Sequence, residues 1–311
     1  MNSFTALGNY STNTSKTELT VKFVAAGSSL YSLAYSYDGT TWNGVTDSST
    51  NIFTVSGRGA AFGNNLWVAV GEGTNTIATS TNGITWTGRG ATIFTGRCLD
   101  AAWNGSLWVA VGEGTNTIAT STNGTTWTGR GATVLTTRGV GVAWNGSLWV
   151  AVGQGTTHNI ATSTDGITWT GRNKIFTTSG FGVAWNGSLW VAVGEGGSSI
   201  AYSSNGTSWT DTGTTVFSTR GNGVAWNGSL WVAVGTGTNT IATSTDGINW
   251  TGRGTAIFST SGSGIAWNSS LGLWVAVGSG TNSIAYSSNG TSWTGLGTSI
   301  FSVIGRGVGS K

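Results

Sequence analysis

The 311 residues include no proline, and the chain has one cysteine, Cys98, and one histidine, His158. A lone cysteine excludes an intramolecular disulfide, and we expect Cys98 to be a small buried residue. A single histidine argues against His-based acid–base catalysis and against His-ligated metal sites, so we expect no metal and no cofactor. The absence of proline favours uninterrupted β-ladders, because proline would remove a strand donor.

Charge is also scarce. Asp, Glu, Lys and Arg make up 7% of the chain, whereas about 25% is usual for soluble proteins. The net charge of +3 is spread along the sequence, which argues against nucleic-acid binding, since that requires a basic stripe. No apolar run approaches the roughly 20 residues of a membrane span.

The first eight residues lack both the basic and the apolar segments of a secretory signal. Asn-Gly-Ser and Asn-Gly-Thr triplets recur along the chain, and we interpret them as turns. Because a glycosylating secretory pathway would modify many of these turns, we expect a cytoplasmic or virion-associated protein.

What the chain does have is a short motif in seven copies. Each copy contains Ser, any residue, Asp or Asn, Gly, two further residues and Trp, and the tryptophans lie 40 to 44 residues apart. A period of this size indicates one supersecondary unit repeated around or along an axis. The motifs end at Trp42, Trp86, Trp127, Trp169, Trp209, Trp250 and Trp293.

One repeat, over residues 139–177, shows what the unit is. Its short apolar stretches cover 139–144, 148–152, 160–163 and 167–170. Asn-Gly and Asp-Gly pairs separate them, and such pairs are typical of type I′ hairpin turns with positive φ at both central residues. We therefore predict an all-β fold, a seven-bladed β-propeller of four-stranded antiparallel blades.

The aromatic residues and the chain ends support this architecture. Of 18 tryptophans, seven close the motif, six lie in second strands and five end first strands, as expected for packing between blades. The first repeat lacks a first strand, while 304–309 resembles one, so we predict that the C-terminal strand joins the N-terminal blade and closes the ring. Residues 1–311 then form a single domain, in which 1–18 are a tail or an extra strand.

The seven-copy motif resembles the Asp-box, or BNR, repeat of sialidase-like propellers and related glycan-processing or glycan-binding proteins. Here the spacing from Asp to Trp is one residue shorter, and four copies carry Asn. The resemblance implies a structural hairpin opposite the catalytic face of such proteins. Sialidases also use an arginine triad, a Tyr–Glu pair and an Asp acid, and no such set can be placed here. We therefore predict no catalytic residues and no enzymatic activity.

Ligand-binding candidates come from the loops after second and fourth strands, which share one rim of a propeller. The selected residues are Glu72, Glu113, Glu195, Asn75, Asn116, Arg89, Arg130, Arg172 and Arg253. Further arginines precede the next blade at Arg58, Arg97, Arg138, Arg220 and Arg306. Such a rim could hydrogen-bond a glycan or a repetitive polymer at several points. The alternative is that Arg and Glu pair with one another on the surface.

Three functions remain open. The favoured one is a non-enzymatic binding or display module for a glycan or surface polymer, with a phage or virus particle as a setting that fits the composition. The second is a structural or self-assembling scaffold, natural or engineered, because residues 142–153, 183–194 and 224–235 are identical. The third is a sialidase-type hydrolase. The sequence leaves the ligand and the oligomeric state open.

Overall fold

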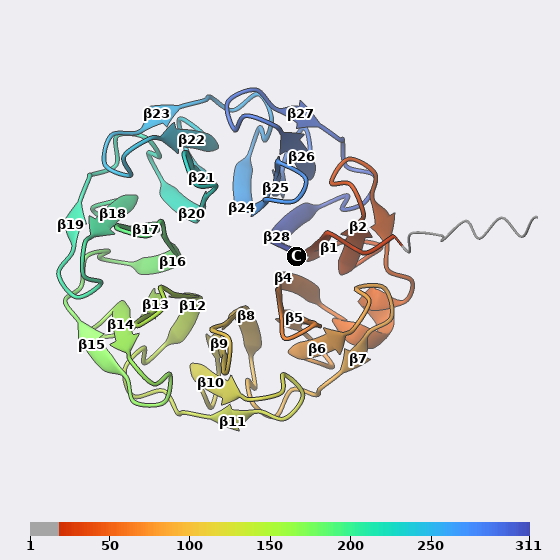
Figure 1. Ribbon diagram of the computed structural model, residues 1–311, viewed down its shortest axis with the longest axis horizontal. Coiled ribbons are helices and arrows are strands. Elements are labelled where there is room, and N and C mark those ends of the chain that lie inside the picture. The colour runs from red at the N-terminus through yellow and green to blue at the C-terminus, as the bar shows by residue number, and fades with distance from the viewer. Residues whose placement is uncertain (1–18) are drawn as a thin grey trace, which may run out of the picture.

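The computed structural model describes residues 19–311, which form a ring of seven four-stranded antiparallel blades around one axis (Figure 1). This confirms the predicted all-β, seven-bladed architecture. The predicted tail or extra strand at 1–18 lies outside the described residues. Within residues 19–311, no helical segment has the length and hydropathy of a membrane span.

Each blade contributes strands in the same order from the axis to the rim. For blades 1 to 7, the inner strands are β28 (Ile304–Ser310), β4 (Ser56–Gly63), β8 (Arg97–Trp103), β12 (Arg138–Trp144), β16 (Ser179–Trp185), β20 (Arg220–Trp226) and β24 (Ser261–Asn268). The second strands are β1 (Phe23–Ser28), β5 (Leu66–Glu72), β9 (Trp108–Glu113), β13 (Trp149–Gln154), β17 (Trp190–Glu195), β21 (Trp231–Thr236) and β25 (Leu273–Ser279).

The third strands are β2 (Leu33–Ser36), β6 (Ile77–Ser80), β10 (Ile118–Ser121), β14 (Ile160–Ser163), β18 (Ile200–Ser203), β22 (Ile241–Ser244) and β26 (Ile284–Ser287). The outer strands are β3 (Asn43–Gly44), β7 (Thr87–Gly88), β11 (Thr128–Gly129), β15 (Thr170–Arg172), β19 (Thr210–Asp211), β23 (Thr251–Gly252) and β27 (Thr294–Gly295). One π-helical turn, η1 (Ser48–Ile52), follows β3.

The second strands form the core because they are apolar on both faces and each blade is covered by two others. In β9, Val109 and Val111 are fully buried, and Trp108 packs against Trp103 of β8 with ring centroids 5.3 Å apart. Val68 of the preceding blade belongs to the apolar cluster of Trp108, whereas Val109 and Val111 point to the other face and pack in a cluster with Trp149 of the next blade. Burying each large side chain stabilises the ring by about 1.5–3 kcal/mol. The predicted packing of the tryptophans between blades is confirmed.

The repeated motif forms a closed hydrogen-bond network at the hairpin between third and outer strands. In blade 3, the Gly124 N–H donates to Ser121 Oγ at 2.8 Å, and the Thr126 N–H donates to Asn123 Oδ1 at 2.9 Å. The Trp127 Nε1–H donates to the Gly124 carbonyl at 2.9 Å. The structural role implied for this hairpin is therefore present, with Asn accepting the turn amides as Asp does.

Two local predictions are wrong. Of the Asn145-Gly146 pair only the glycine has positive φ, at 101°, so this turn is not type I′. The Asn145 side chain instead accepts the Leu148 N–H at 2.7 Å and closes the turn itself. Within the described residues, one pair of successive non-glycine residues has positive φ at both positions. The pair is Asn64 and Asn65, with φ of 51° and 56°.

The outer strand of blade 4 is also displaced from its predicted position at 167–170. It is β15, Thr170–Arg172. Asp165 Oδ1 accepts the N–H groups of Ile167 and Thr168, both at 2.8 Å, which holds these two residues in the turn. The carboxylate of the hairpin thus delays the start of the strand.

The ring is closed by the two ends of the described chain. Inner strand β28 pairs antiparallel with β1, with Val24 opposite Gly309. Beyond the pairing, the Lys311 N–H donates to the Lys22 carbonyl at 2.9 Å. The predicted insertion of the C-terminal strand into the N-terminal blade is confirmed, and it pairs the edge that β1 would otherwise expose.

Candidate functional site

All seven inner strands contain a β-bulge at their third common position. In β16, Gly180 pairs with Gly194 and Gly182 pairs with Val193, so Phe181 is left out of the ladder. A bulge changes the direction of the side chain that is left out of the ladder. Here that side chain lines the axial channel. We call the seven equivalent residues the lumen residues: Arg306, Arg58, Leu99, Val140, Phe181, Asn222 and Ser263.

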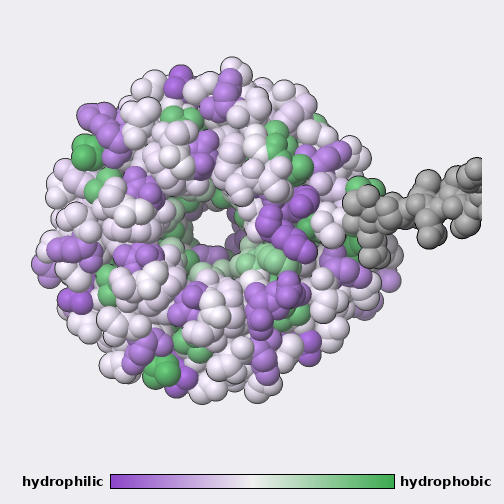
Figure 2. All heavy atoms as spheres, in the orientation of Figure 1, coloured by the Kyte–Doolittle hydropathy of each residue, from purple (hydrophilic) through white to green (hydrophobic). Residues whose placement is uncertain are grey.

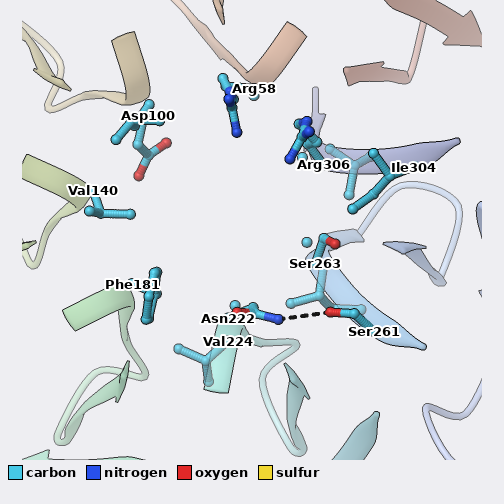
Figure 3. Close-up of a pocket in the computed structure, with 18 of the residues that line it drawn as sticks. Arg58, Asp100, Val140, Phe181, Asn222, Val224, Ser261, Ser263, Ile304 and Arg306 are labelled. Carbon is cyan, nitrogen blue, oxygen red and sulfur yellow. Dashed lines mark hydrogen bonds between the residues drawn. The ribbon is translucent and has the colours of Figure 1, made fainter. Parts of the chain in front are cut away.

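The lumen residues divide the channel wall into three sectors. Arg306 and Arg58, in blades 1 and 2, form a basic sector. Leu99, Val140 and Phe181 follow in blades 3 to 5 as an apolar sector. Asn222 and Ser263 complete the ring in blades 6 and 7 as a neutral polar sector. Figure 3 shows the arginines and Phe181 on opposite sides of the channel.

The lumen position is also where the repeats differ. Across the seven blades it carries six residue types, more than any other position of the inner strands. The positions on either side are almost always glycine. Gly182 is one of these flanking glycines, and a Cβ at this residue would lie 3.2 Å from the Asn222 carbonyl oxygen of the next blade. The backbones are thus kept close together while the side chain between the glycines varies.

The channel is a real cavity. Its volume is about 610 Å³, and Figure 2 shows the axis of the ring open to solvent. The amide of Asn222 donates to Ser261 Oγ at 3.1 Å and to the Gly262 carbonyl at 2.7 Å, which ties blade 6 to blade 7 along the wall. A preformed cavity of this size is typical of small-molecule sites.

Three half-buried ion pairs surround the mouth of the channel, the end at which the inner strands begin. The pairs are Arg58–Glu72 at 2.7 Å, Arg97–Glu113 at 3.0 Å and Arg220–Glu195 at 3.9 Å. Exposed or partly exposed pairs of this kind are each worth about 0–1 kcal/mol. The sequence left open whether these arginines and glutamates bind a ligand or pair with one another. At Glu72, Glu113 and Glu195 the structure shows the ion pairs.

Two arginines of the mouth have no carboxylate within 4.0 Å in the described part of the chain, Arg138 and Arg306. Burial and the neighbouring charges of Arg58 and Arg97 lower the pKa of Arg306 to about 10. Burial, followed by the charge of Arg97, also lowers the pKa of Arg138. Both stay protonated at neutral pH, so the mouth carries excess positive charge.

One carboxylate lies deeper in the channel. Asp100 occupies a position held by glycine in every other inner strand. Its oxygens accept the Ala101 N–H at 2.8 Å and the Val142 N–H of the next blade at 3.0 Å. Burial raises the pKa of Asp100 to about 7 despite these hydrogen bonds. Among residues 19–311, no three His, Cys, Asp or Glu side chains gather as a metal site would require.

The asparagines selected from the sequence lie in the predicted loops, where backbone groups occupy them. Asn75 donates to the Ile52 carbonyl at 2.9 Å and accepts the Gly90 N–H at 2.8 Å. Asn116 makes the equivalent bonds to the Ile93 carbonyl and the Gly131 N–H, at 2.8 and 2.9 Å. Both fasten neighbouring loops together, and a role in ligand binding remains a prediction.

The selected arginines lie apart from the glutamates, beside the outer strands. Arg130 donates through Nε and Nη2 to Thr120 Oγ1 at 2.9 and 2.7 Å. The other three donate to the equivalent threonine side chains: Arg89 to Thr79, Arg172 to Thr162 and Arg253 to Thr243. The nine candidates are thus split between the channel mouth and the rim.

At the rim, Arg130 lines a small groove between blades 3 and 4 with Trp169, Thr117 and Thr133. A second groove lies at the same place between blades 7 and 1, where Leu296 replaces the arginine and Trp42 supplies the indole. We call these two the blade grooves. They combine a half-buried indole with hydroxyl groups.

Sequence reasoning noted the mouth arginines but missed Phe181, Asn222 and Asp100 as channel residues. A signal was available in the repeats themselves: one position varies between two nearly constant glycines. A bulge shifts side-chain direction by one residue, so strand alternation alone could not show which residue faces the axis.

Comparisons with known proteins identify the fold alone. No family model matches the chain, and no curated protein matches it. Among solved structures, YCF48 from Cyanidioschyzon merolae is 14% identical with a TM-score of 0.57, covering 86% of this chain and 95% of its own. The computationally designed Ika8 protein is 11% identical with a TM-score of 0.54, covering 82% and 80%. A chain of a nidogen/laminin complex is 13% identical with a TM-score of 0.55, and the match covers 72% of this chain and 88% of that one. The chain is similar to these propellers, and the Asp-box resemblance rests on its hairpins.

Proposed function

We propose that this protein is a non-enzymatic binding module that recognises a repetitive surface polymer, a glycan being the class whose chemistry fits best. The observation that carries the proposal is the pairing of Arg130 with Trp169 in one groove between blades. An indole offers a flat apolar face to a sugar ring, while guanidinium and threonine groups offer hydrogen bonds to its hydroxyls.

Repetition supports a polymer as the ligand. An arginine stands at the position of Arg130 in four blades, and each is followed in the next blade by the tryptophan of the repeated motif. Sites repeated around one rim would engage a polymer several times, so that weak contacts add up to useful avidity. A place on a phage or virus particle remains a prediction from composition.

The test is binding to immobilised polysaccharides at low salt, comparing the wild type with an Arg130→Leu, Arg172→Leu double variant. Leucine is the residue that blade 7 carries there, as Leu296, so the ring tolerates it. We expect binding to fall at least about tenfold, because two of the repeated contacts are lost together. A matched Phe181→Ser variant, altered in the channel, should bind as the wild type does. Equal binding by the rim variant would refute the proposal.

A self-assembling scaffold is the second candidate, favoured by the identity of residues 142–153, 183–194 and 224–235. Such near-repeats suit a protein selected for its ring rather than for one site. Concentration-dependent assembly in sedimentation, with no polysaccharide bound, would favour this function. Turnover of fluorogenic glycosides would instead indicate a hydrolase.

A further inference from the structure

We propose that the axial channel binds one small organic anion, a carboxylate carried on an apolar body, held across the channel between Arg306 and Phe181. This site is separate from the blade grooves and goes beyond the polymer binding proposed above. It uses the lumen residues, which the repeats vary, whereas the grooves use residues that the repeats share.

The charge of the ligand follows from the basic sector. Arg306 has no carboxylate within 4.0 Å in residues 19–311, and its hydrogen bond there is to Ser28 Oγ at 3.3 Å. Its neighbour Arg58 is held by Glu72 at 2.7 Å. A guanidinium matches the planar geometry of a carboxylate and binds it more strongly than a neutral acceptor. The unpaired member of this sector is therefore the anion-binding group.

The apolar body of the ligand follows from the opposite wall. Phe181 faces the arginines across the channel, and Val140 lies beside it on the same wall (Figure 3). The Cζ atoms of Arg138 and Arg220 lie 6.0 and 5.2 Å from the centroid of the Phe181 ring. Both distances are within the range of a cation–π contact with the ring. An aromatic wall opposite the guanidinium of Arg306 suits a ligand with an apolar end and an anionic end.

The carboxylate already present in the channel does not neutralise Arg306. Asp100 extends from blade 3, and both of its oxygens accept backbone N–H groups of the wall, from Ala101 and Val142. It makes no ion pair within 4.0 Å among the described residues. The positive charge of Arg306 is therefore left for a ligand.

The number and size of ligands follow from the asymmetry of the channel. The three sectors occur once around the ring, so one orientation of one molecule satisfies them, whereas the rim repeats. The cavity of about 610 Å³ lies within the range of roughly 300–1,000 Å³ usual for small-molecule sites. The expected stoichiometry is one ligand per chain.

The experiment is isothermal titration of the full chain with naphthalene-2-carboxylate and with its neutral amide, 2-naphthamide. We expect one saturable site per chain for the carboxylate and at least about tenfold weaker binding of the amide, because the charged contact to Arg306 is lost. Raising the salt concentration should weaken the carboxylate alone.

Variants take their new side chains from the same position of another blade, so that the wall tolerates them. Arg306→Ser and Phe181→Ser both introduce the residue found at Ser263. Arg306→Ser should remove the preference for carboxylate over amide, and Phe181→Ser should weaken both probes about tenfold. Arg253→Leu, which removes a rim arginine and introduces the residue found at Leu296, is the matched control and should change neither.

Three results would overturn the proposal: no saturable binding by the wild type, several sites per chain, or an Arg306→Ser variant that keeps its preference for the carboxylate. Melting curves of each variant confirm that loss of binding is not loss of folding. Failure here leaves the polymer-binding test unaffected, since that test depends on Arg130 and Arg172.

Discussion

At the third position of the repeated motif, aspartate and asparagine accept the same backbone hydrogen bonds and differ in charge. Asp165 Oδ1 accepts the N–H groups of Ile167 and Thr168, as Asn123 Oδ1 accepts those of its own turn. The Thr168 and Ile167 N–H groups lower the pKa of Asp165 to about 2. A carboxylate held in this way adds a dependence on pH that an amide lacks.

The sign of that dependence can be tested with Asp165→Asn. Because the folded-state pKa lies below the ordinary value of about 3.9, Asp165 stabilises the fold above pH 4 and loses this contribution as pH falls toward 2. We expect the melting temperature of the wild type to fall more steeply over this window than that of Asp165→Asn. The reverse exchange, Asn123→Asp, should make the fall steeper. Identical acid profiles for all three proteins would contradict the argument.

Cys98 illustrates burial at a single position. It is a fully buried residue of the inner strand β8, at a position where the other six inner strands have glycine. Its Sγ lies 3.4 Å from the Val111 carbonyl oxygen. Burial, and then the charge of Asp100, raise the pKa of its thiol well above the usual value. The expectation of a small buried residue is confirmed.

The thiol of Cys98 should therefore be inert in the folded protein, because thiolate is the reactive form and the sulfur is out of reach. With a thiol-reactive disulfide reagent we expect no reaction over hours in buffer and one equivalent in guanidinium chloride. A Cys98→Gly variant is the blank in both conditions. Rapid reaction of the native protein would show that the wall of blade 3 opens.

At the scale of the element, the hairpin between third and outer strands depends on a glycine in the left-handed region. Gly124 has φ of 75°, and a Cβ there would lie 2.7 Å from Leu66 Cδ2 of the preceding blade. Gly131 has nearly the same φ, 78°, with no heavy atom within 4 Å of its Cβ position. The pair separates backbone strain from crowding between blades.

We expect Gly131→Ala to cost about 1 kcal/mol through the strained φ alone. Gly124→Ala should cost about 1–3 kcal/mol more, because the methyl group also displaces a packed leucine. Urea unfolding of both variants measures the difference. Equal losses would mean that blades 2 and 3 separate at little cost, contrary to their shared apolar cluster.

A strand could be predicted from the sequence where its own residues carry the pattern that identifies it. The second strands followed from apolar runs such as 148–152, and β28 followed from its likeness to other inner strands. The start of β15 did not, since it depends on where the Asp165 carboxylate directs its hydrogen bonds. The direction of Phe181 did not either, since a bulge alters the face without altering the composition. The fold was therefore predictable, and the channel lining was not.

At the scale of the whole molecule, stability depends on a ring whose closure, between strands β28 and β1, is made without a covalent bond. Strand β28 is the inner strand of blade 1, between β24 of blade 7 and β4 of blade 2, and it pairs with β1. Asn268 of blade 7 also donates through Nδ2 to the Lys311 carbonyl at 2.7 Å. Apart from crossing loops, the first and last blades are joined by packing and these hydrogen bonds.

Removing residues 304–311 should lower the unfolding temperature and make Phe23–Ser28 accessible to protease, because β1 becomes an edge and its apolar neighbours are uncovered. Removing Lys311 alone is the matched control and should cost far less. Calorimetry with limited proteolysis gives both readouts. A truncated chain that melts and resists protease like the control would show that the blades hold together without closure.

The bulge gives this ring one further property. Each lumen side chain is outside its own ladder, so exchanging it leaves the strand pairing of the wall intact. Reordering whole blades would shuffle the basic, apolar and polar sectors while every interface kept nearly the same residues. The molecule thus has a constant frame with seven replaceable contact points, and new specificities could arise by recombination of blades rather than by repacking.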